Sequence, residues 1–397
     1  MENRLYELLE IKTKDDLGTV SKKVKIRVPK LRKYAQNMVI PSGEDAKKIQ
    51  QYLGISDLVY RLKLGDIDLN LKEKIAQHAS EIAELFEKET TVIEDISTVP
   101  VFETELGKLY HDDSIQVMKN MPDESVDLVF ADPPFNLGKD YESRIDDKLS
   151  KETYLRWTNQ WVKEAVRIVK PGGSVFIWNL PKWNVHISNM MEGHLTLRHW
   201  VAVDMKYGLP INGKLYPSHY SLLYYVKGSK PNVFNPERIP LDVCHTCGHE
   251  LKDYGGYKSK MNPKGVNLSD VWNDIYPVRH SKYKNRGSNE LPLKLLDRII
   301  SIATNPGDTV FDPFGGSGTT YAVAEILKRK WIGSEIGPVD QIIDRLKHLE
   351  MESRQIDEIH SKKNHLFLPN IEALRRKNGY WLPEDFEGPQ VEQERLF

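Results

Sequence analysis

The spacing of hydrophobic and polar residues changes near residue 100. Before it, apolar residues recur three or four positions apart among charged ones, as at 69–89, and this spacing predicts helices. From about residue 105, short apolar runs end in Gly, Pro or Asp and alternate with helical patterns, which is typical of parallel α/β units. The chain therefore predicts a charged, helical N-terminal extension over 1–100, followed by an α/β domain.

The α/β part contains five clear strands with helices between them. The predicted strands are 126–134, 173–179, 221–228, 308–316 and 329–337. The predicted helices are 151–170, 291–304 and 317–329. Short turns join the last two helices to their strands, so we expect right-handed crossovers on one sheet. The stretch 229–288 is rich in Pro, Gly, Asn, Lys and Tyr and lacks strong periodicity, which predicts an insertion outside the sheet.

Composition narrows the class of protein. A chain of 397 residues allows two or three domains, and its 56 Lys and Arg against 57 Asp and Glu mean that a polyanion must meet a local basic face. Mean hydropathy is −0.52, and no apolar run approaches the roughly 20 residues of a membrane span. The N-terminus lacks a secretory pattern and two cysteines make no disulfide framework, so we expect a cytoplasmic protein.

The segment FDPFGGSGTT at 311–320 follows an apolar strand and opens a helix. Its glycines let the backbone approach a ligand closely, and the helix start offers free N–H groups. Glu335 ends the next strand, where a carboxylate can accept both hydroxyls of a ribose. Because no Gly-Lys-Ser/Thr follows the glycines, we predict a cofactor with a ribose but without a phosphate.

A second candidate site is VFADPPFNLG at 129–138, again at a strand end. It combines one carboxylate, Asp132, with two prolines that lack N–H donors and with the ring of Phe135. Asp132 and a proline carbonyl can accept both hydrogens of an NH₂ group while Phe135 stacks on the attached ring. These residue types suit a planar substrate that bears an amine.

Together, DPPF and FDPFGGSGTT resemble the motifs of the S-adenosylmethionine-dependent DNA amino-methyltransferases, the N6-adenine and N4-cytosine family. The catalytic turn comes first, an order similar to that of the permuted β class, and the resemblance covers roughly 105–340. It implies a Rossmann-like sheet of seven strands with S-adenosyl-L-methionine as the cofactor. The implied organisation is a catalytic half at 101–228, a target-recognition region at 229–288, a cofactor-binding half at 289–345 and a C-terminal extension at 346–397.

The resemblance also implies which residues form the site. The implied catalytic residues are Asp132, Pro133, Pro134 and Phe135. Asp113 matches the acidic residue that faces the adenine of the cofactor in this family. The implied cofactor-binding residues are Asp113, Asp132, Phe311, Asp312, Pro313, Phe314, Gly315, Gly316, Ser317, Gly318, Thr319 and Glu335.

The implied reaction is direct transfer of a methyl group to an amine of a base that has left the duplex stack. Asp as the first motif residue resembles the adenine enzymes and Ser the cytosine enzymes, so we predict an adenine-N6 enzyme, with cytosine N4 as the alternative. Methylation of cytosine carbon 5 requires a cysteine nucleophile, and neither Cys244 nor Cys247 follows a strand end.

Two weaker patterns concern DNA and metal. The stretch 276–290 interleaves basic residues with tyrosines, which predicts phosphate and base contacts. The expected DNA-binding residues are Arg279, His280, Lys282, Lys284 and Arg286. Cys244, Cys247 and His249 form half of a zinc ribbon, but no second cysteine pair completes four ligands, so we expect no metal and keep zinc as an alternative.

The implied partners are double-stranded DNA and, functionally, a cognate restriction endonuclease. An RNA-base or protein-glutamine methyltransferase is an alternative, although its glycines usually come first. A catalytically silent DNA-binding subunit is another, against which the intact Asp132 and Glu335 argue. The recognition sequence, a homodimer and the role of 1–100 stay open.

Overall fold

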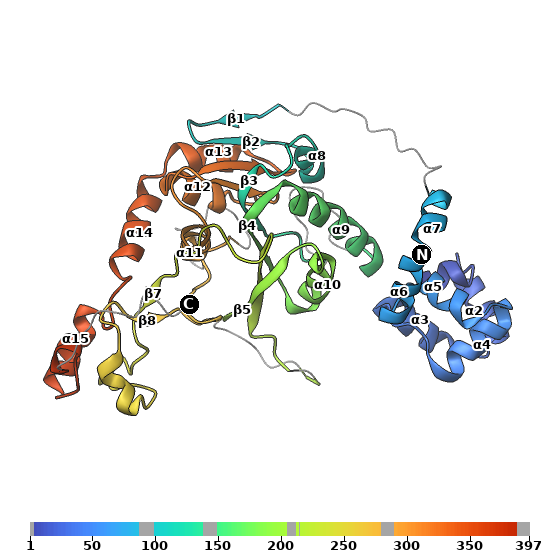
Figure 1. Cartoon of the computed structure of the whole chain (residues 1–397), viewed down its shortest axis with the longest axis horizontal. Coiled ribbons are helices and arrows are strands. Elements are labelled where there is room, and N and C mark those ends of the chain that lie inside the picture. Colours follow the sequence, from blue (N-terminus) through green and yellow to red (C-terminus); the bar gives the residue numbers. More distant parts are fainter. Residues whose placement is uncertain are drawn as a thin grey trace. The chain divides into compact units, whose positions relative to one another are not determined.

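The computed structural model describes residues 4–86, 99–137, 149–204, 212–213, 215–278 and 290–386 (Figure 1). The chain forms two compact units, which are described separately. The first unit comprises residues 1–96, 136–141 and 145–160, and the second comprises residues 97–135, 142–144 and 161–397. No helix in the described ranges is both long and apolar enough to cross a membrane.

The first unit is helical, as the spacing of its apolar residues predicts. Its helices are α1 (Arg4–Leu8), α2 (Lys14–Val24), α3 (Val28–Asn37), α4 (Gly43–Leu53), α5 (Asp57–Leu64), α6 (Leu69–Gln77) and α7 (Ala79–Phe86). Leu17, Leu31 and Ile49 lie in its core. The single helix expected at 69–89 is divided instead, because α6 ends at His78, which leaves helical geometry, before α7 begins.

The first part of α9 (Lys151–Ile168) belongs to the same unit. Glu152 is buried and accepts a hydrogen bond from the backbone N–H of Arg4, with 2.9 Å between nitrogen and Oε2. Arg156 lies 2.9 Å from Glu152 and 3.4 Å from Glu7. Polar contacts therefore join the start of α9 to α1 within this unit.

The second unit is built on a sheet of nine strands in the order β1-β2-β11-β10-β3-β4-β6-β5-β9. The strands are β1 (Phe102–Glu103), β2 (Gly107–Tyr110), β3 (Val126–Ala131), β4 (Val169–Asn179), β5 (Thr196–Asp204), β6 (His219–Val226), β9 (Val271–Trp272), β10 (Thr309–Asp312) and β11 (Lys330–Ser334). The strands from β2 to β4 run parallel, and β6 is antiparallel to both of its neighbours. Since β1 and β9 add only two residues at each edge, seven strands form the body of a Rossmann-like sheet, as expected.

Helices cover both faces of this sheet. They are α8 (Ser114–Lys119), α9, α10 (Pro181–Met191), α11 (Leu293–Ala303), α12 (Thr319–Ile326), α13 (Asp340–Lys347) and α14 (Glu350–Ser361). Figure 1 shows α11, α12 and α13 on one side and α8 and α10 on the other. Leu295 and Ile299 of α11 share a core with Leu128 and Phe130 of β3, so α11 is joined to the sheet by buried apolar contacts.

The predicted insertion is not wholly outside the sheet. Its β9 pairs in parallel with Ala202 and Val203 of β5 and extends the sheet edge, which corrects the expectation for 229–288. The two-stranded sheet of β7 (Arg238–Ile239) and β8 (Val266–Asn267) and the 3₁₀ helix η1 (Gly255–Lys260) form most of the remaining regular structure described there.

The end of the chain packs on this insertion. It carries α15 (Pro369–Lys377) and the 3₁₀ helix η3 (Pro383–Asp385). Phe367, Ile371 and Leu382 share a small buried core with Leu241 and Val243. The insertion and the C-terminal segment therefore stabilise each other apart from the core of the large sheet.

Candidate active site

The two motifs singled out in the sequence meet at one edge of the sheet. β10 and β3 are parallel neighbours, with Val310 opposite Leu128 and Phe311 opposite Val129. Parallel neighbours end at the same sheet edge, so the turn at 132–135 and the turn at 312–318 lie side by side. The topology thus brings together two segments that are far apart in the sequence.

The glycine turn depends on backbone geometry that favours glycine. Gly316 and Gly318 have φ of 55° and 77°, in the left-handed region. Gly318 is also the N-cap of α12, so the turn leads directly into a helix N-terminus. At Gly315 a Cβ would lie 2.5 Å from the hydroxyl oxygen of Tyr321, which packs beneath the turn. A side chain at Gly316 or Gly318 is therefore disfavoured by backbone conformation, and one at Gly315 by contact with Tyr321.

Asp312 is a buried carboxylate at the start of this turn, 2 % exposed. It accepts hydrogen bonds from the Thr320 hydroxyl at 2.5 Å and from the Phe314 backbone N–H at 2.9 Å. Burial raises its pKa to about 7, because these two hydrogen bonds only partly offset the loss of solvation. Asp312 therefore fixes the turn rather than facing solvent.

Glu335 stands at the end of β11, beside the glycine turn. Its two carboxylate oxygens accept backbone N–H groups from Gly316 at 2.6 Å and from Gly337 at 2.7 Å. Each oxygen has a second lone pair that can accept a ligand hydroxyl. The structure thus holds the predicted ribose acceptor rigidly at the sheet edge.

Asp113 follows β2, which pairs with β11 through Tyr110 and Ser334. Its side chain is the N-cap of α8 and accepts the N–H of Ile115 at 2.8 Å. Asp113 and Glu335 therefore follow the ends of neighbouring parallel strands, like the two turns.

A buried arginine supports the glycine turn from below, and the sequence analysis missed it. Arg345 of α13 donates to the carbonyl of Ser317 at 2.8 Å and to the hydroxyl of Thr319 at 2.9 Å. It also lies 3.1 Å from Glu290 and 2.7 Å from Glu352. No local pattern marks Arg345, because its contacts come from segments remote in sequence.

The other turn presents a carboxylate and an aromatic ring. Asp132 is half-buried, Pro133 is buried and Phe135 is 8 % exposed. The carbonyl of Phe135 accepts the indole N–H of Trp183 at 2.6 Å. This bond from α10 fixes the backbone of the turn.

Tyr220 is a further residue of this site that the sequence analysis did not single out. Its ring centroid lies 6.1 Å from that of Phe135 and 4.7 Å from that of Trp178, on which it stacks. Burial and the negative charge of Asp132 raise the pKa of Tyr220. The only signal in the sequence is that Tyr220 stands directly before the predicted strand 221–228.

Two predictions remain, on DNA contacts and on zinc. Arg279, His280, Lys282, Lys284 and Arg286 all lie outside the described residues. Cys244 and Cys247 are half-buried thiols in a tight turn, in which Cys244 N–H donates to the His249 carbonyl at 2.8 Å. The Nδ1 atom of His249 lies 2.8 Å from the carbonyl of Glu250. Within the described ranges, no three His, Cys, Asp or Glu side chains gather as metal ligands.

Comparison with known proteins gives consistent matches. The N6/N4 methyltransferase family model, described as DNA methylase, matches residues 126–343. The Type II methyltransferase M.BamHI of Bacillus amyloliquefaciens is 49% identical over 379 residues, 94% of this chain and 90% of that protein. The DNA adenine methyltransferase YhdJ of Escherichia coli (strain K12) is 34% identical over 242 residues, 59% of this chain and 80% of that protein. The solved PvuII DNA methyltransferase (cytosine-N4-specific) matches with a TM-score of 0.48 and 22% identity, covering 66% of this chain and 94% of that one.

Proposed function

The chain belongs to the N6/N4 DNA methylase family, and from that premise we propose that it methylates the N6 amine of adenine at a specific site in double-stranded DNA. S-adenosyl-L-methionine is the methyl donor of this family. One observation carries the proposal. The turn at 132–135 and the turn at 312–318 follow neighbouring parallel strands, so an amine bound at the first turn faces a donor held at the second.

The donor set at the sheet edge fits this cofactor. Glu335 would hold the ribose hydroxyls through its remaining lone pairs, and Asp113 would face the adenine. The left-handed backbone of Gly316 and Gly318 leads into the N-terminus of α12, where the N–H groups of the first turn have no partner within the helix. The residues that would complete the cradle are Phe311, Asp312, Pro313, Phe314, Gly315, Ser317 and Thr319. When bound, the cofactor supplies an electrophilic methyl group.

The protein's own task is to bind and orient the base. Phe135 offers a ring for stacking, and Tyr220 stands at the side of the same pocket, against Trp178. Pro133 and Pro134 have no N–H groups that could compete for the carboxylate of Asp132. Asp132 and the Pro133 carbonyl can therefore accept the two hydrogens of the amine and direct its lone pair at the methyl group.

Asp132 also accepts the proton that the amine loses. A neutral exocyclic amine is a weak base whose proton becomes acidic only as the new N–C bond forms. An oriented carboxylate is then a sufficient acceptor, and its negative charge stabilises the positive charge that develops on nitrogen. The reaction so described needs no cysteine and no metal ligand from this chain.

The choice of adenine is the finer part of the proposal. An Asp at position 132 and the likeness to the adenine methyltransferase YhdJ support it. The N4 amine of cytosine could make the same contacts with Asp132 and the Pro133 carbonyl, because it also lies next to a ring nitrogen. Cytosine N4 is therefore the second candidate.

Likeness to Type II methyltransferases supports a role in restriction-modification. In that role the enzyme protects host DNA in the cytoplasm from a cognate endonuclease, which need not bind it. Arg279, His280, Lys282, Lys284 and Arg286 remain the proposed DNA contacts. For Cys244 and Cys247 we propose a reduced turn without metal.

Methyl transfer from labelled S-adenosylmethionine to unmethylated DNA, followed by mass spectrometry of the nucleosides, tests the proposal. We expect N6-methyladenine from the unaltered chain and at least a ~10²-fold slower reaction from Asp132→Ala. Asp123→Ala, at an exposed carboxylate paired with Arg167, is the matched control and should keep full activity. N4-methylcytosine would keep the mechanism and change the base, whereas cofactor binding without any methylated nucleoside would refute the proposal.

A further inference from the structure

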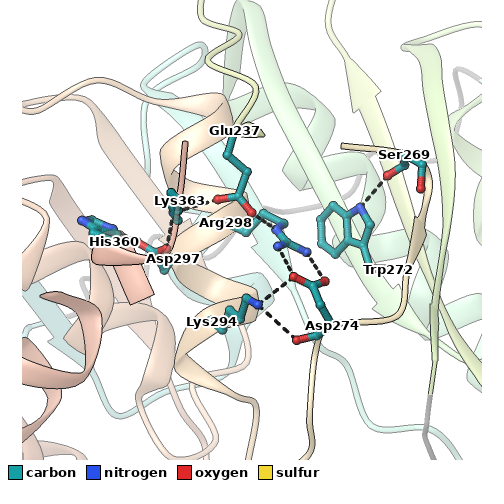
Figure 2. Close-up of polar contacts among 9 residues, drawn as sticks. All are labelled: Glu237, Ser269, Trp272, Asp274, Lys294, Asp297, Arg298, His360 and Lys363. Atoms are coloured by element: carbon teal, nitrogen blue, oxygen red, sulfur yellow. Dashed lines mark hydrogen bonds and ion pairs between the residues drawn. The ribbon is translucent and has the colours of Figure 1, made fainter. Parts of the chain in front are cut away.

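A network of charged side chains joins the insertion to the body of the second unit (Figure 2). At its centre is Arg298 of α11, which is 1 % exposed. Arg298 donates two parallel hydrogen bonds to the carboxylate of Asp274, at 2.8 and 2.7 Å, and a third bond to Glu237. The guanidinium also lies over the ring of Trp272, 5.0 Å from its centroid. One side chain thus binds three residues of the insertion.

Neighbouring charges complete the network. Lys294 lies 2.7 Å from Asp274. Lys363 lies 2.8 Å from Glu237 and 2.6 Å from Asp297, and His360 also contacts Asp297. Three carboxylates therefore face one arginine and two lysines, as Figure 2 shows, with His360 beside Asp297.

Glu237 and Asp274 lie at the two ends of one segment of the insertion. Glu237 stands just before β7, and Asp274 stands just after β9, the strand by which the insertion rejoins the sheet. Arg298 therefore ties together both ends of the segment 238–273. Asn235 adds to the first end, because its N–H donates to the carbonyl of Ile302 at 2.8 Å.

Stability alone is a poor reason for such an arrangement. Burying ions costs several kcal/mol each in lost hydration, and replacing a buried ion network by apolar residues of similar volume is often neutral or stabilising. What a bidentate Arg–carboxylate pair adds is a fixed direction and distance. Because α11 itself packs on β3 through Leu295 and Ile299, that fixed geometry extends to the strand that ends at Asp132.

We propose that Arg298 is a positioning residue, which sets the segment 238–273 in register with the pocket at Asp132 so that DNA bound by this segment presents its target base to the pocket. The inference rests on the proposed function and on the expected role of 229–288 as the target-recognition region. Arg298 touches neither the base nor the cofactor in this account. It acts through Asp274, Trp272 and Glu237.

The first variants to compare are Arg298→Met, which removes the bonds and keeps most of the volume, and Arg298→Lys, which keeps one charge. Arg298→Met leaves the carboxylates of Glu237 and Asp274 without their main partner, so this variant can fail to fold. The triple variant removes both negative charges as well and carries Arg298→Met, Glu237→Gln and Asp274→Asn. Arg167→Met is the matched control: Arg167 also binds two acids, Asp123 and Glu164, and its other side-chain hydrogen bonds go to carbonyls at 118 and 121, outside the insertion.

The substrates are duplexes that carry the site methylated by the unaltered protein, or that site with one base pair changed. For the triple variant we expect KM for DNA to rise about tenfold and discrimination against the changed site to fall about tenfold. The kcat at saturating DNA and the affinity for S-adenosylmethionine should stay within about twofold. Arg298→Lys should recover part of the discrimination. Arg167→Met should leave both the KM for DNA and the discrimination unchanged.

Hydrogen exchange gives a readout that does not depend on methylation. Backbone amides of 238–273 should exchange faster in the triple variant, while those of β3 and β10 should not. Unchanged discrimination and unchanged KM in a folded triple variant would overturn the proposal, as would faster exchange throughout the sheet. If the unaltered protein methylates no DNA, the proposed function fails instead. The exchange pattern then still tests whether Arg298 fixes the segment 238–273.

Discussion

Asp312 shows how a single buried carboxylate can make the fold sensitive to pH. Its pKa in the folded protein, about 7, lies above its ordinary value, so the folded state holds an extra proton between pH 4 and 7. The stabilising contribution of this proton is complete below pH 4 and is lost as the pH rises towards 7. Above that pH the carboxylate is ionised in a site that solvates it poorly.

Asp312→Asn is therefore expected to change stability in a pH-dependent way. The amide can keep contacts with Thr320 and Phe314 and never ionises, so the variant should gain on the order of 4 kcal/mol relative to the unaltered protein between pH 4 and pH 8. Urea unfolding at several pH values measures this difference. Two parallel curves would show that Asp312 does not titrate in this range.

Two variants of Tyr220 distinguish the effect of its aromatic ring from that of its hydroxyl group. If the ring borders the base, Tyr220→Phe should keep methyl transfer within about threefold, and Tyr220→Ala should slow it by roughly 10-fold to 100-fold through lost stacking. Single-turnover rates with saturating DNA measure both. Equal losses in the two variants would point to the hydroxyl instead.

At the scale of elements, the glycine turn and α12 act as one piece. A Cβ at Gly318 would lie 2.7 Å from Cγ2 of Ile342 and would also be strained at φ 77°. We expect Gly318→Ala to weaken binding of S-adenosylmethionine at least about tenfold, measured by calorimetry. Gly193→Ala is the matched control, because Gly193 also has positive φ, at 83°, but no atom lies within 4 Å of its Cβ position. Equal affinities in both variants would contradict this expectation.

Strands and helices with strong periodicity could be predicted from the sequence, and their ends could not. The strand predicted at 308–316 ends at Asp312, because the following Pro and Gly residues turn the backbone although they continue an apolar run. β5 is not among the predicted strands. Its first five residues are exposed, so apolar and polar residues do not alternate regularly along it. α10 is not among the predicted helices, although Pro181 is a favourable first helical residue.

The site could be predicted where its chemistry lies in one short segment. The turn at 132–135, the turn at 312–318 and Glu335 are each local motifs, and strand order places them together. Tyr220 and Arg345 act through contacts with segments remote in sequence, which no local pattern reveals. Arg298 is similar, since its acids lie 24 and 61 positions away.

At the scale of the whole molecule, the chain contains two units with separate cores. Leu31 is fully buried in the core of the first unit, and Phe130 in that of the second. Leu31→Ala should destabilise the first unit by about 3 kcal/mol through the cavity it leaves, without changing the affinity of the second unit for S-adenosylmethionine. Differential scanning calorimetry should show one transition shifted and the other in place. A shift of both transitions together would mean that the units unfold cooperatively.

The order of the two turns along the chain also has a consequence for synthesis on the ribosome. Asp132 leaves the ribosome about 180 residues before Asp312, and β3 gains β10 as its sheet neighbour only when the later strand has been made. At roughly 5–20 residues per second, this delay lasts on the order of ten seconds or more. On the proposed function, a nascent chain that stops before β10 carries the turn proposed to bind the base without the turn proposed to hold the methyl donor. On that function, methyl transfer begins only after β10, α12 and β11 have been made.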